Sequence, residues 1–258
     1  SIVWTTTSGM PCLDSTTPVK VDCPLTLRFD QLTLEEGDPA ELRRLYTELE
    51  FRSLLAELEQ DNPSTAAPEV IGKDGYETIT SEAELLRWLE KLKAAELFAL
   101  DLETNSLDYM RAEICGLSFA VEPGQAAYVP VAHSYPGAPA QLDRALVLGY
   151  LKPLLEDASR PKVLQNAKYD MSVLARHGIT LRGVRYDTML ESYVLDSTAT
   201  RHDMDSLALK YLGEKTVSFE EIAGKGAKQL TFNQIDLEQA APYACEDVDI
   251  TLRLHGEL

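Results

Sequence analysis

The stretch FALDLETNSL, residues 98–107, begins as an apolar run typical of a core strand and then places two carboxylates two positions apart. Side chains at positions i and i+2 of a strand project from the same face, so Asp101 and Glu103 are expected to point the same way. A buried carboxylate without a partner is very costly. The stretch therefore indicates either an ordinary strand end that runs into solvent or a place where the protein needs acids at the edge of its core.

Two further segments place acids beside core elements. The segment QNAKYD, residues 165–170, follows a short apolar strand and puts Asp170 at the opening of a helix, where negative charge is favoured. The segment YACED, residues 243–247, places Tyr243 and Asp247 four positions apart, hence on one helical face. A helix cap and a tyrosine packed beside a solvated acid would be the ordinary explanations. Three acidic segments on three elements next to the core are harder to explain separately than together.

Convergence of these segments would bring four carboxylates within a few ångströms, where mutual repulsion raises pKa values steeply. A divalent cation removes that penalty, and Mg²⁺ prefers oxygen ligands. The three segments contain no histidine and only one cysteine, Cys245, so their candidate ligands are mainly carboxylates, which argues against zinc or copper as the preferred metal. We therefore expect two divalent cations, Mg²⁺ or Mn²⁺, with Zn²⁺ as a substitute in crystals. Two such ions can hold the attacking and leaving oxygens of a phosphodiester.

The charge balance limits the partners. The chain has 258 residues, with 24 lysines and arginines against 42 aspartates and glutamates, and a formal net charge of −18. This balance argues against a protein that grips nucleic acid through a broad basic surface. Either the substrate is not a polyanion, or cations mediate the contact, or another part of a larger molecule supplies the grip. The predicted metal site favours the last two explanations.

The hydrophobic pattern predicts an α/β protein. Three strand-like runs with short connections indicate an antiparallel meander, and a later alternation of strands and helices indicates parallel strands beside it. Together they predict a mixed five-stranded sheet flanked by helices. A helix after Ser81 is expected to begin with a capping box that includes Glu84. The candidate strands are 76–79, 97–103, 114–121, 126–132, 162–165 and 183–188, and the candidate helices are 143–156, 168–177, 188–196 and 203–212, with a long final helix.

The compact domain is expected at residues 67–258, after a poorly ordered N-terminal segment at 1–66. That segment includes a helical pattern at 39–60 and a linker with two prolines at 61–70. No apolar run approaches the roughly 20 residues of a membrane span, and the first residues lack the pattern of a signal peptide. Four cysteines lie far apart, which fits free thiols in a reducing cytoplasm.

In their order and separation, DLET, NAKYD and YACED resemble the three exonuclease motifs of the DEDD superfamily, in its tyrosine-bearing subgroup. Neighbouring segments such as PKVLQNAKYDMSVLARHGI, RHDMDSLALKYLG and FEEIAGKGAKQLTFNQI are similar to the proofreading domain of bacterial DNA polymerase I. The resemblance covers residues 67–258 almost without a break. The segment from residue 19 to the linker is similar to the tail of the 5′-nuclease domain in that polymerase family, whereas the first 17 residues do not match it.

The resemblance implies a ribonuclease H-like sheet and a 3′–5′ exonuclease. Such an enzyme removes 3′-terminal nucleotides from single-stranded or frayed DNA as the proofreading part of a bacterial, cytoplasmic replication and repair polymerase. Its expected partners are the 3′ end of single-stranded DNA and a polymerase domain in cis. We expect a monomer that does not bind membranes.

The resemblance also implies roles for the acids. Asp101, Glu103 and Asp247 would ligate the first metal ion, and Asp101 would also reach the second, supported through water by Asp170. Tyr243 and Glu103 would orient the attacking water. A tyrosine pKa near 10 is too high for a general base at neutral pH, so metal rather than phenol is expected to generate the nucleophile.

A second group of residues matches positions on the substrate side of the family. Leu107 and Phe219 match positions that wedge against or stack on the last bases of the strand, and an aromatic platform binds any base without sequence choice. Taken without the resemblance, both would be read as core residues. The remaining matches are Gln165, Asn166, Tyr169 and Arg201.

Two alternative functions stay open. The first is an RNA 3′ exonuclease similar to ribonuclease D, and the second is a catalytically silent scaffold that only supports a polymerase domain. The glycine-rich segment GKGAK at 224–228 lacks the phosphate-loop pattern and is expected to be a turn. The acids near His202 are expected to start a helix, with Asp203 near its cap, rather than to bind a metal.

Overall fold

The computed structural model describes residues 38–49, 51, 54, 58, 74–198 and 201–258. The chain divides into two compact units, Ser1–Pro63 and Ser64–Leu258. In the first unit, α1 (Pro39–Glu48) forms within the expected helical pattern at 39–60. The expected linker at 61–70 and most of the N-terminal segment at 1–66 lie outside the described residues, so the boundary between 66 and 67 stays a prediction.

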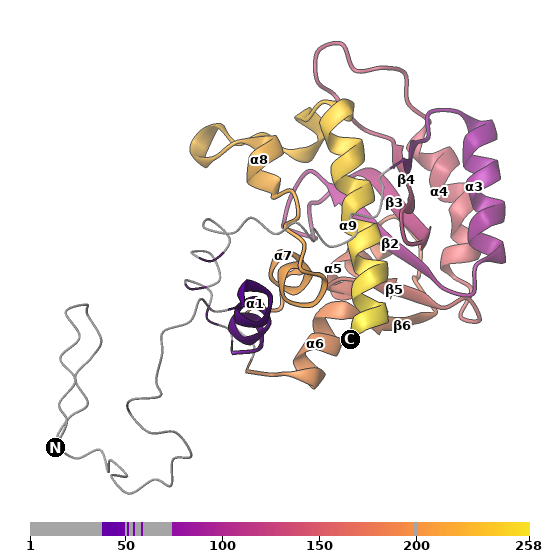
Figure 1. Ribbon diagram of the computed structural model, residues 1–258. Coiled ribbons are helices and arrows are strands. Elements are labelled where there is room, and N and C mark those ends of the chain that lie inside the picture. The colour runs from indigo at the N-terminus through magenta and orange to yellow at the C-terminus, as the bar shows by residue number, and fades with distance from the viewer. Residues whose placement is uncertain (1–37, 50, 52–53, 55–57, 59–73, 199–200) are drawn as a thin grey trace, which may run out of the picture. The chain divides into compact units, whose positions relative to one another are not determined.

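The second unit is built on a mixed sheet with the strand order β1-β4-β3-β2-β5-β6 (Figure 1). The antiparallel meander of β2, β3 and β4 is confirmed, and β5 and β6 add parallel strands beside β2. The α/β class and the mixed sheet are therefore as the sequence predicts. The strands are β1 (Gly75–Thr78), β2 (Phe98–Thr104), β3 (Ile114–Glu122), β4 (Gln125–Pro130), β5 (Lys162–Leu164) and β6 (Val184–Asp187).

The expected number of five strands is wrong, because the described residues form a sheet of six. The additional strand is β1, which pairs in parallel with β4 at the edge, with Tyr76 opposite Ala126. The pairing of the two strands extends one residue beyond β1, because the Ile79 amide donates to the Tyr128 carbonyl at 2.8 Å. The hydrophobic pattern marks β1 as a strand, but a four-residue edge strand leaves little signal for whether it joins the sheet.

Helices cover both faces of the sheet. One face packs on α3, α4 and α5, and the other packs on α9, which is yellow in Figure 1. None of the described helices is both long enough and apolar enough to cross a membrane. The helices of this unit are α3 (Glu82–Ala94), α4 (Arg144–Leu155), α5 (Ala167–Arg176), α6 (Thr188–Leu195), α7 (Met204–Leu207), α8 (Phe219–Ala223) and α9 (Leu237–Glu257), with a π-helical turn at Ala208–Leu212 and 3₁₀ turns at Gly226–Lys228 and Phe232–Gln234.

Polar side chains begin the helices where the sequence predicts. The capping box of α3 is present, since the Ser81 hydroxyl accepts from the Glu84 amide and the Glu84 carboxylate accepts from the Ser81 amide. Asp203 caps α7 by accepting from the Ser206 amide at 3.0 Å, as expected. These caps satisfy N–H groups that a helix leaves without internal partners.

The two faces of β2 have different neighbours. Phe98, Leu100 and Leu102 alternate into the core beneath α3 and α4, whereas Ala99 faces the core beneath α9. The α9 side of that core is rich in small residues such as Ala240 and Ala244, which lets the helix lie close to the strands. Because alternation is strict along a strand, the positions two and four after Ala99 also face α9.

A glycine in β3 permits this close packing. Gly116 lies opposite Glu103 in the ladder, and a β-carbon at Gly116 would stand 2.1 Å from the Tyr128 hydroxyl. The Tyr128 ring is fully buried, and its hydroxyl makes a 2.7 Å hydrogen bond with His133. The Tyr128 ring therefore cannot move aside to relieve a clash with a methyl group added at Gly116.

We predict that Gly116→Ala destabilises the domain by about 1–3 kcal/mol, the usual cost of overpacking a buried site. Gly149→Ala is the matched control, because it adds the same methyl group to an exposed position of α4 with no atom within 4 Å. The control is expected to be neutral or to stabilise α4 by about 0.5–1 kcal/mol. Urea unfolding measures both variants, and an equal stability of the two would contradict the packing account.

Candidate metal and active site

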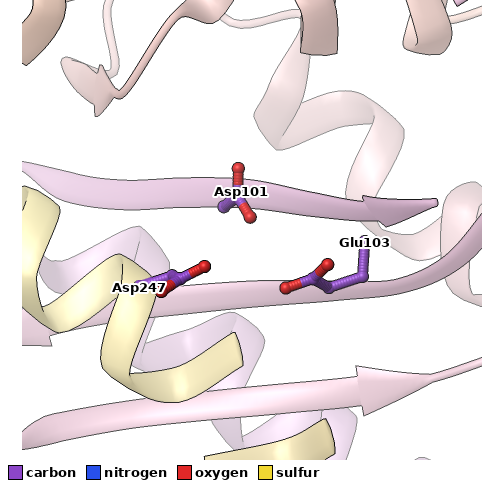
Figure 2. A group of neighbouring side chains, drawn as sticks. All are labelled: Asp101, Glu103 and Asp247. Carbon is purple, nitrogen blue, oxygen red and sulfur yellow. The ribbon is translucent and has the colours of Figure 1, made fainter. Parts of the chain in front are cut away.

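Three carboxylates from two elements meet at the α9 face of the sheet. Asp101 and Glu103 project from β2, and Asp247 projects from α9 toward them (Figure 2). Each offers a ligand oxygen, and these oxygens all lie within 4.8 Å of one another. The register between β2 and β3 shifts between Glu103 and Thr104, so the strand bends directly beside the acids.

A fourth carboxylate comes from the first turn of α5. Asp170 is 2% exposed and interacts electrostatically with Asp101. It does not belong to the group of three whose ligand oxygens lie within 4.8 Å. The sequence prediction that all three acidic segments converge on one region is therefore matched by the structure, with Asp170 at its margin.

The electrostatics of the cluster are unfavourable without a cation. Burial raises the pKa of Asp101 to about 6. Burial, followed by repulsion from Asp101, raises the pKa values of Asp170 and Asp247 well above the ordinary range, and the pKa of Glu103 is raised by burial and by all three neighbours. The metal-free cluster thus favours protonation.

The donor set fits a hard divalent cation. Glu103 Oε1 and Asp170 Oδ1 are buried, and neither has a hydrogen-bond partner among the described residues. Buried polar atoms are almost always paired, so two unpaired carboxylate oxygens in one place need an explanation. Oxygen ligands without cysteine or histidine suit Mg²⁺ or Mn²⁺. The oxygens of Asp101, Glu103 and Asp247 lie close enough together to hold one such ion.

Tyr243 lies one helical turn before Asp247 on α9. Its hydroxyl lies close enough to the Asp247 carboxylate for the two groups to influence each other's pKa. Burial raises the pKa of Tyr243 above its ordinary value, and the negative charges of Asp247 and Glu103 raise it further. The phenol therefore stays protonated at neutral pH, so it can donate a hydrogen bond but does not serve as a base.

Asn166, at the start of α5, has a left-handed backbone with φ of 58°, and no other non-glycine residue has a positive φ in the described part of the chain. Its side chain makes no capping bond and is exposed. The main-chain amides of Asn166 and Ala167 instead donate to the Asp187 carboxylate at 3.1 and 2.9 Å. Left-handed backbone in a non-glycine residue is costly and clusters at functional sites.

Asp187 therefore has two tasks, because the same carboxylate also accepts from the Met189 and Leu190 amides at the start of α6. Sequence reasoning missed this residue. The available signal was an aspartate followed by threonine directly before a helical pattern, which is typical of an N-cap, but the sequence did not indicate that one carboxylate caps two helices.

Two residues expected on the substrate side also have structural partners. The Tyr169 hydroxyl donates to the Ser106 carbonyl at 2.5 Å, which ties α5 to the loop after β2. The Gln165 amide donates to the His202 carbonyl at 3.0 Å, and its oxygen accepts from the Thr188 hydroxyl. Both residues support the walls of the site as well as lining it.

A cleft of about 1020 Å³ opens beside the acids, and Asp101, Glu103, Asp170 and Tyr243 line it. Most residues expected on the substrate side line the same cleft: Leu107, Phe219, Gln165, Asn166 and Tyr169.

The two residues expected to contact bases differ in their exposure. Leu107 is 96% exposed, which contradicts the alternative that it belongs to the core. Phe219 is partly buried and packs on Phe232 with ring centroids 6.4 Å apart. Both rings also contact the Tyr243 ring, with centroids 6.3 Å from Phe219 and 6.1 Å from Phe232, so the three rings form one cluster beside the acids. Sequence reasoning did not single out Phe232, because a lone phenylalanine before a helix reads as core.

Arg201 lies apart from these residues. It does not line the cleft, its side chain is 77% exposed, and its guanidinium lies 3.6 Å from the Asp203 carboxylate. Its expected contact with substrate stays a prediction.

Comparison with known proteins places these observations in a family. The sequence model of a family described as 3′–5′ exonuclease matches residues 76–258. DNA polymerase I of Pseudomonas aeruginosa is 56% identical over 247 residues, which are 93% of this chain and 27% of that protein. DNA polymerase I of Rhizobium leguminosarum is 41% identical over 196 residues, or 69% of this chain and 19% of that protein. The chain thus spans about a quarter or less of the length of these relatives.

Solved structures share the fold. Ribonuclease D of Trypanosoma brucei, solved in complex with RNA U12, has a TM-score of 0.58 at 17% identity and covers 71% of this chain and 62% of its own. The POL domain of Pol1 from M. smegmatis, in complex with DNA primer-template and dNTP, has a TM-score of 0.50 at 23% identity, over 70% of this chain and 27% of its own.

We predict that the metal-free protein loses stability as pH rises from about 5 to 8. The four acids have raised pKa values in the folded state, so the folded state binds more protons than the unfolded state between the ordinary and the raised values. The stability that the protonated acids contribute at low pH is therefore lost as the pH rises through the pKa values that they have in the folded state. The expected fall in unfolding free energy is about 1–3 kcal/mol.

Asp170→Asn removes one ionisable carboxylate from the cluster. Comparison of this variant with the wild type shows how much of the pH dependence comes from the cluster. In EDTA, its unfolding free energy is expected to fall less steeply with pH and to exceed that of the wild type at pH 8. Chemical denaturation across this pH range measures both profiles. Superimposable profiles would show that the cluster carries no electrostatic penalty.

Proposed function

The chain belongs to the 3′–5′ exonuclease family, and from that premise we propose that it hydrolyses the 3′-terminal nucleotides of single-stranded or frayed DNA with two divalent cations. The observation that carries this proposal is the cluster of Asp101, Glu103 and Asp247, whose ligand oxygens lie within 4.8 Å of one another. Phosphodiester hydrolysis by two metal ions needs such a set of oxygen ligands next to an accessible cleft.

Asp101, Glu103 and Asp247 would hold the first cation, and Asp101 together with Asp170 would support the second. Bound divalent cations supply Lewis-acid stabilisation of the phosphate charge and a nucleophile from water at neutral pH. The protein contributes the fixed placement of the ligands. β2 carries two of the acids on one face, and α9 packs against that face through small residues.

Tyr243 and Glu103 would orient the attacking water. The raised pKa of Tyr243 keeps its hydroxyl protonated, so the proton-accepting role falls to other groups. Leu107 and Phe219 would hold the terminal bases, the first as an exposed wedge and the second as a ring supported by Phe232. Asn166 presents its side chain in the cleft from a strained backbone, and Arg201 would contact the strand outside it.

The relatives support a proposal for the role of the whole protein. We propose that this chain is the proofreading part of a bacterial DNA polymerase I, which acts in replication and repair in the cytoplasm, with the polymerase domain in cis. Residues 1–66 would then be the remnant of a 5′-nuclease domain and its linker, and the domain would act as a monomer. The identity of 56% to such a polymerase over 93% of this chain supports the proposal.

Two other functions receive less support. A silent scaffold would not need four acids and a tyrosine around unpaired buried oxygens. An RNA exonuclease similar to ribonuclease D shares the fold, but the polymerase relatives are much more similar in sequence. A comparison of DNA and RNA oligonucleotides of the same sequence decides between the two substrates, and faster digestion of RNA would favour the ribonuclease.

We predict that Asp170→Ala abolishes hydrolysis, with a loss of at least about 10³-fold, because the second cation loses its support. Digestion of a 5′-labelled single-stranded oligonucleotide in Mg²⁺ measures the rate. Asp157→Ala is the matched control, since it removes an exposed acid that contacts Ser159. Circular dichroism is expected to show both variants folded. Retained hydrolysis by Asp170→Ala would exclude the assigned role.

We also predict weak binding of DNA when divalent cations are absent. A net charge of −18 repels a polyanion, and among the described residues no lysine or arginine lines the cleft to offset that repulsion. Fluorescence anisotropy of a labelled oligonucleotide in EDTA is expected to give a dissociation constant in the micromolar range or weaker, on the order of 1 µM or above. Nanomolar affinity in EDTA would contradict this prediction, because it would require a cationic surface that binds DNA despite the negative net charge.

A further inference from the structure

The cleft has an unusual lining for a site that would hold nucleic acid. Among the residues that the structure describes, no lysine or arginine lines it, whereas Asp101, Glu103, Asp170 and Asp203 do. Proteins normally gain most of their affinity for nucleic acid from contacts between cationic side chains and phosphates. In this cleft, strand binding has to rely on bound cations and on contacts to the bases.

The aromatic residues of the cleft could provide those base contacts, and one of them has no role so far. Tyr193 lies on α6 and lines the cleft, and Met189, one helical turn earlier, lines it as well. The next pair along the helix, Leu190 and Val194, lines a separate hollow on the outside of α6. The helix therefore turns one specific face, which contains Tyr193, toward the acids.

The Tyr193 ring is held in place although it is 48% exposed. It stacks on the His202 imidazole with ring centroids 3.5 Å apart and an interplanar angle of 25°. His202 is only 9% exposed, its Nδ1 makes a 2.8 Å hydrogen bond with the Ser192 hydroxyl, and its carbonyl accepts from Gln165. The imidazole is thus a fixed support for one face of the tyrosine.

A supported ring with an accessible surface in an anionic cleft is suited to stacking on a nucleobase. Base–aromatic stacking does not depend on sequence and needs no positive charge. Because the ring is already ordered by His202, little side-chain freedom is lost when a base binds. The hydroxyl of Tyr193 makes no hydrogen bond among the described contacts, so the accessible ring surface is the feature that a ligand can use.

We propose that Tyr193, supported by His202, is a base-stacking platform for the single strand on the α6 side of the cleft, in addition to Leu107 and Phe219. This inference rests on the proposed exonuclease function and adds a binding residue to it. The platform holds a nucleotide of the strand through its base, while the acids and their cations hold the 3′-terminal phosphodiester. Its contribution is to substrate capture rather than to the chemical step.

Steady-state hydrolysis of a 5′-labelled single-stranded oligothymidylate in Mg²⁺ tests the platform with three variants. Tyr193→Leu keeps apolar bulk but removes the ring, so KM is expected to rise about 5- to 50-fold with kcat within about twofold of the wild type. Tyr193→Phe keeps the ring and is expected to retain the wild-type KM. Val194→Ala, an exposed neighbour on the other side of α6, is the control and is expected to change neither constant.

The outcomes separate this inference from the function on which it rests. A wild-type protein that leaves the oligonucleotide intact would overturn both proposals. A wild-type protein that digests it, together with an unchanged KM for Tyr193→Leu, would overturn the platform alone. A fall in kcat of Tyr193→Leu and Tyr193→Phe alike, with KM unchanged, would also overturn it, because the hydroxyl and not the ring would then matter. Thermal unfolding midpoints equal to the wild type are expected, since the side chain is half exposed.

Discussion

The crowding of four buried carboxylates on the α9 face of the sheet is the constraint on which the rest of this site depends. Burial raises the pKa values of all four acids, and repulsion from Asp101 raises those of Glu103, Asp170 and Asp247 further. A protein gains nothing in stability from such an arrangement, and two of the buried oxygens have no partner among the described residues. The electrostatic cost of burying these acids is explained if divalent cations bind there, because the positive charge of a cation attracts each carboxylate and offsets their mutual repulsion.

The fold concentrates this charge with simple elements. Alternation along β2 sends apolar side chains to one core and two acids to the other face. Small residues on α9 let that helix approach the sheet, so that Asp247 reaches the acids of β2. Gly116, the ladder partner of Glu103, makes room for Tyr128. The described residues that line the cleft around the acids are polar, apolar and aromatic, with no lysine or arginine among them.

The sequence allowed the acids and the class of fold to be predicted, because both follow from local periodicity. The spacing of Asp101 and Glu103 on a strand, and of Tyr243 and Asp247 on a helix, determines their direction before any tertiary contact is known. The role of Asp187 could not be predicted in the same way, since its carboxylate joins two helix starts about 20 residues apart in the chain. The stacking of Tyr193 on His202 likewise depends on a tertiary contact across a loop. The strand at 76–79 was predicted, but its place in the sheet was not, because the pairing of a short edge strand is specified mainly by backbone hydrogen bonds.

A crystal of the protein soaked in Mn²⁺ tests the central claim most directly, because anomalous scattering locates the metal independently of any assay. We expect two peaks next to the Asp101 carboxylate, one of them also in contact with Glu103 and Asp247 and the other on the side of Asp170. Peaks that avoid these carboxylates, or no peak within coordination distance of Asp101 at millimolar Mn²⁺, would contradict the claim that the buried acids are there to bind metal.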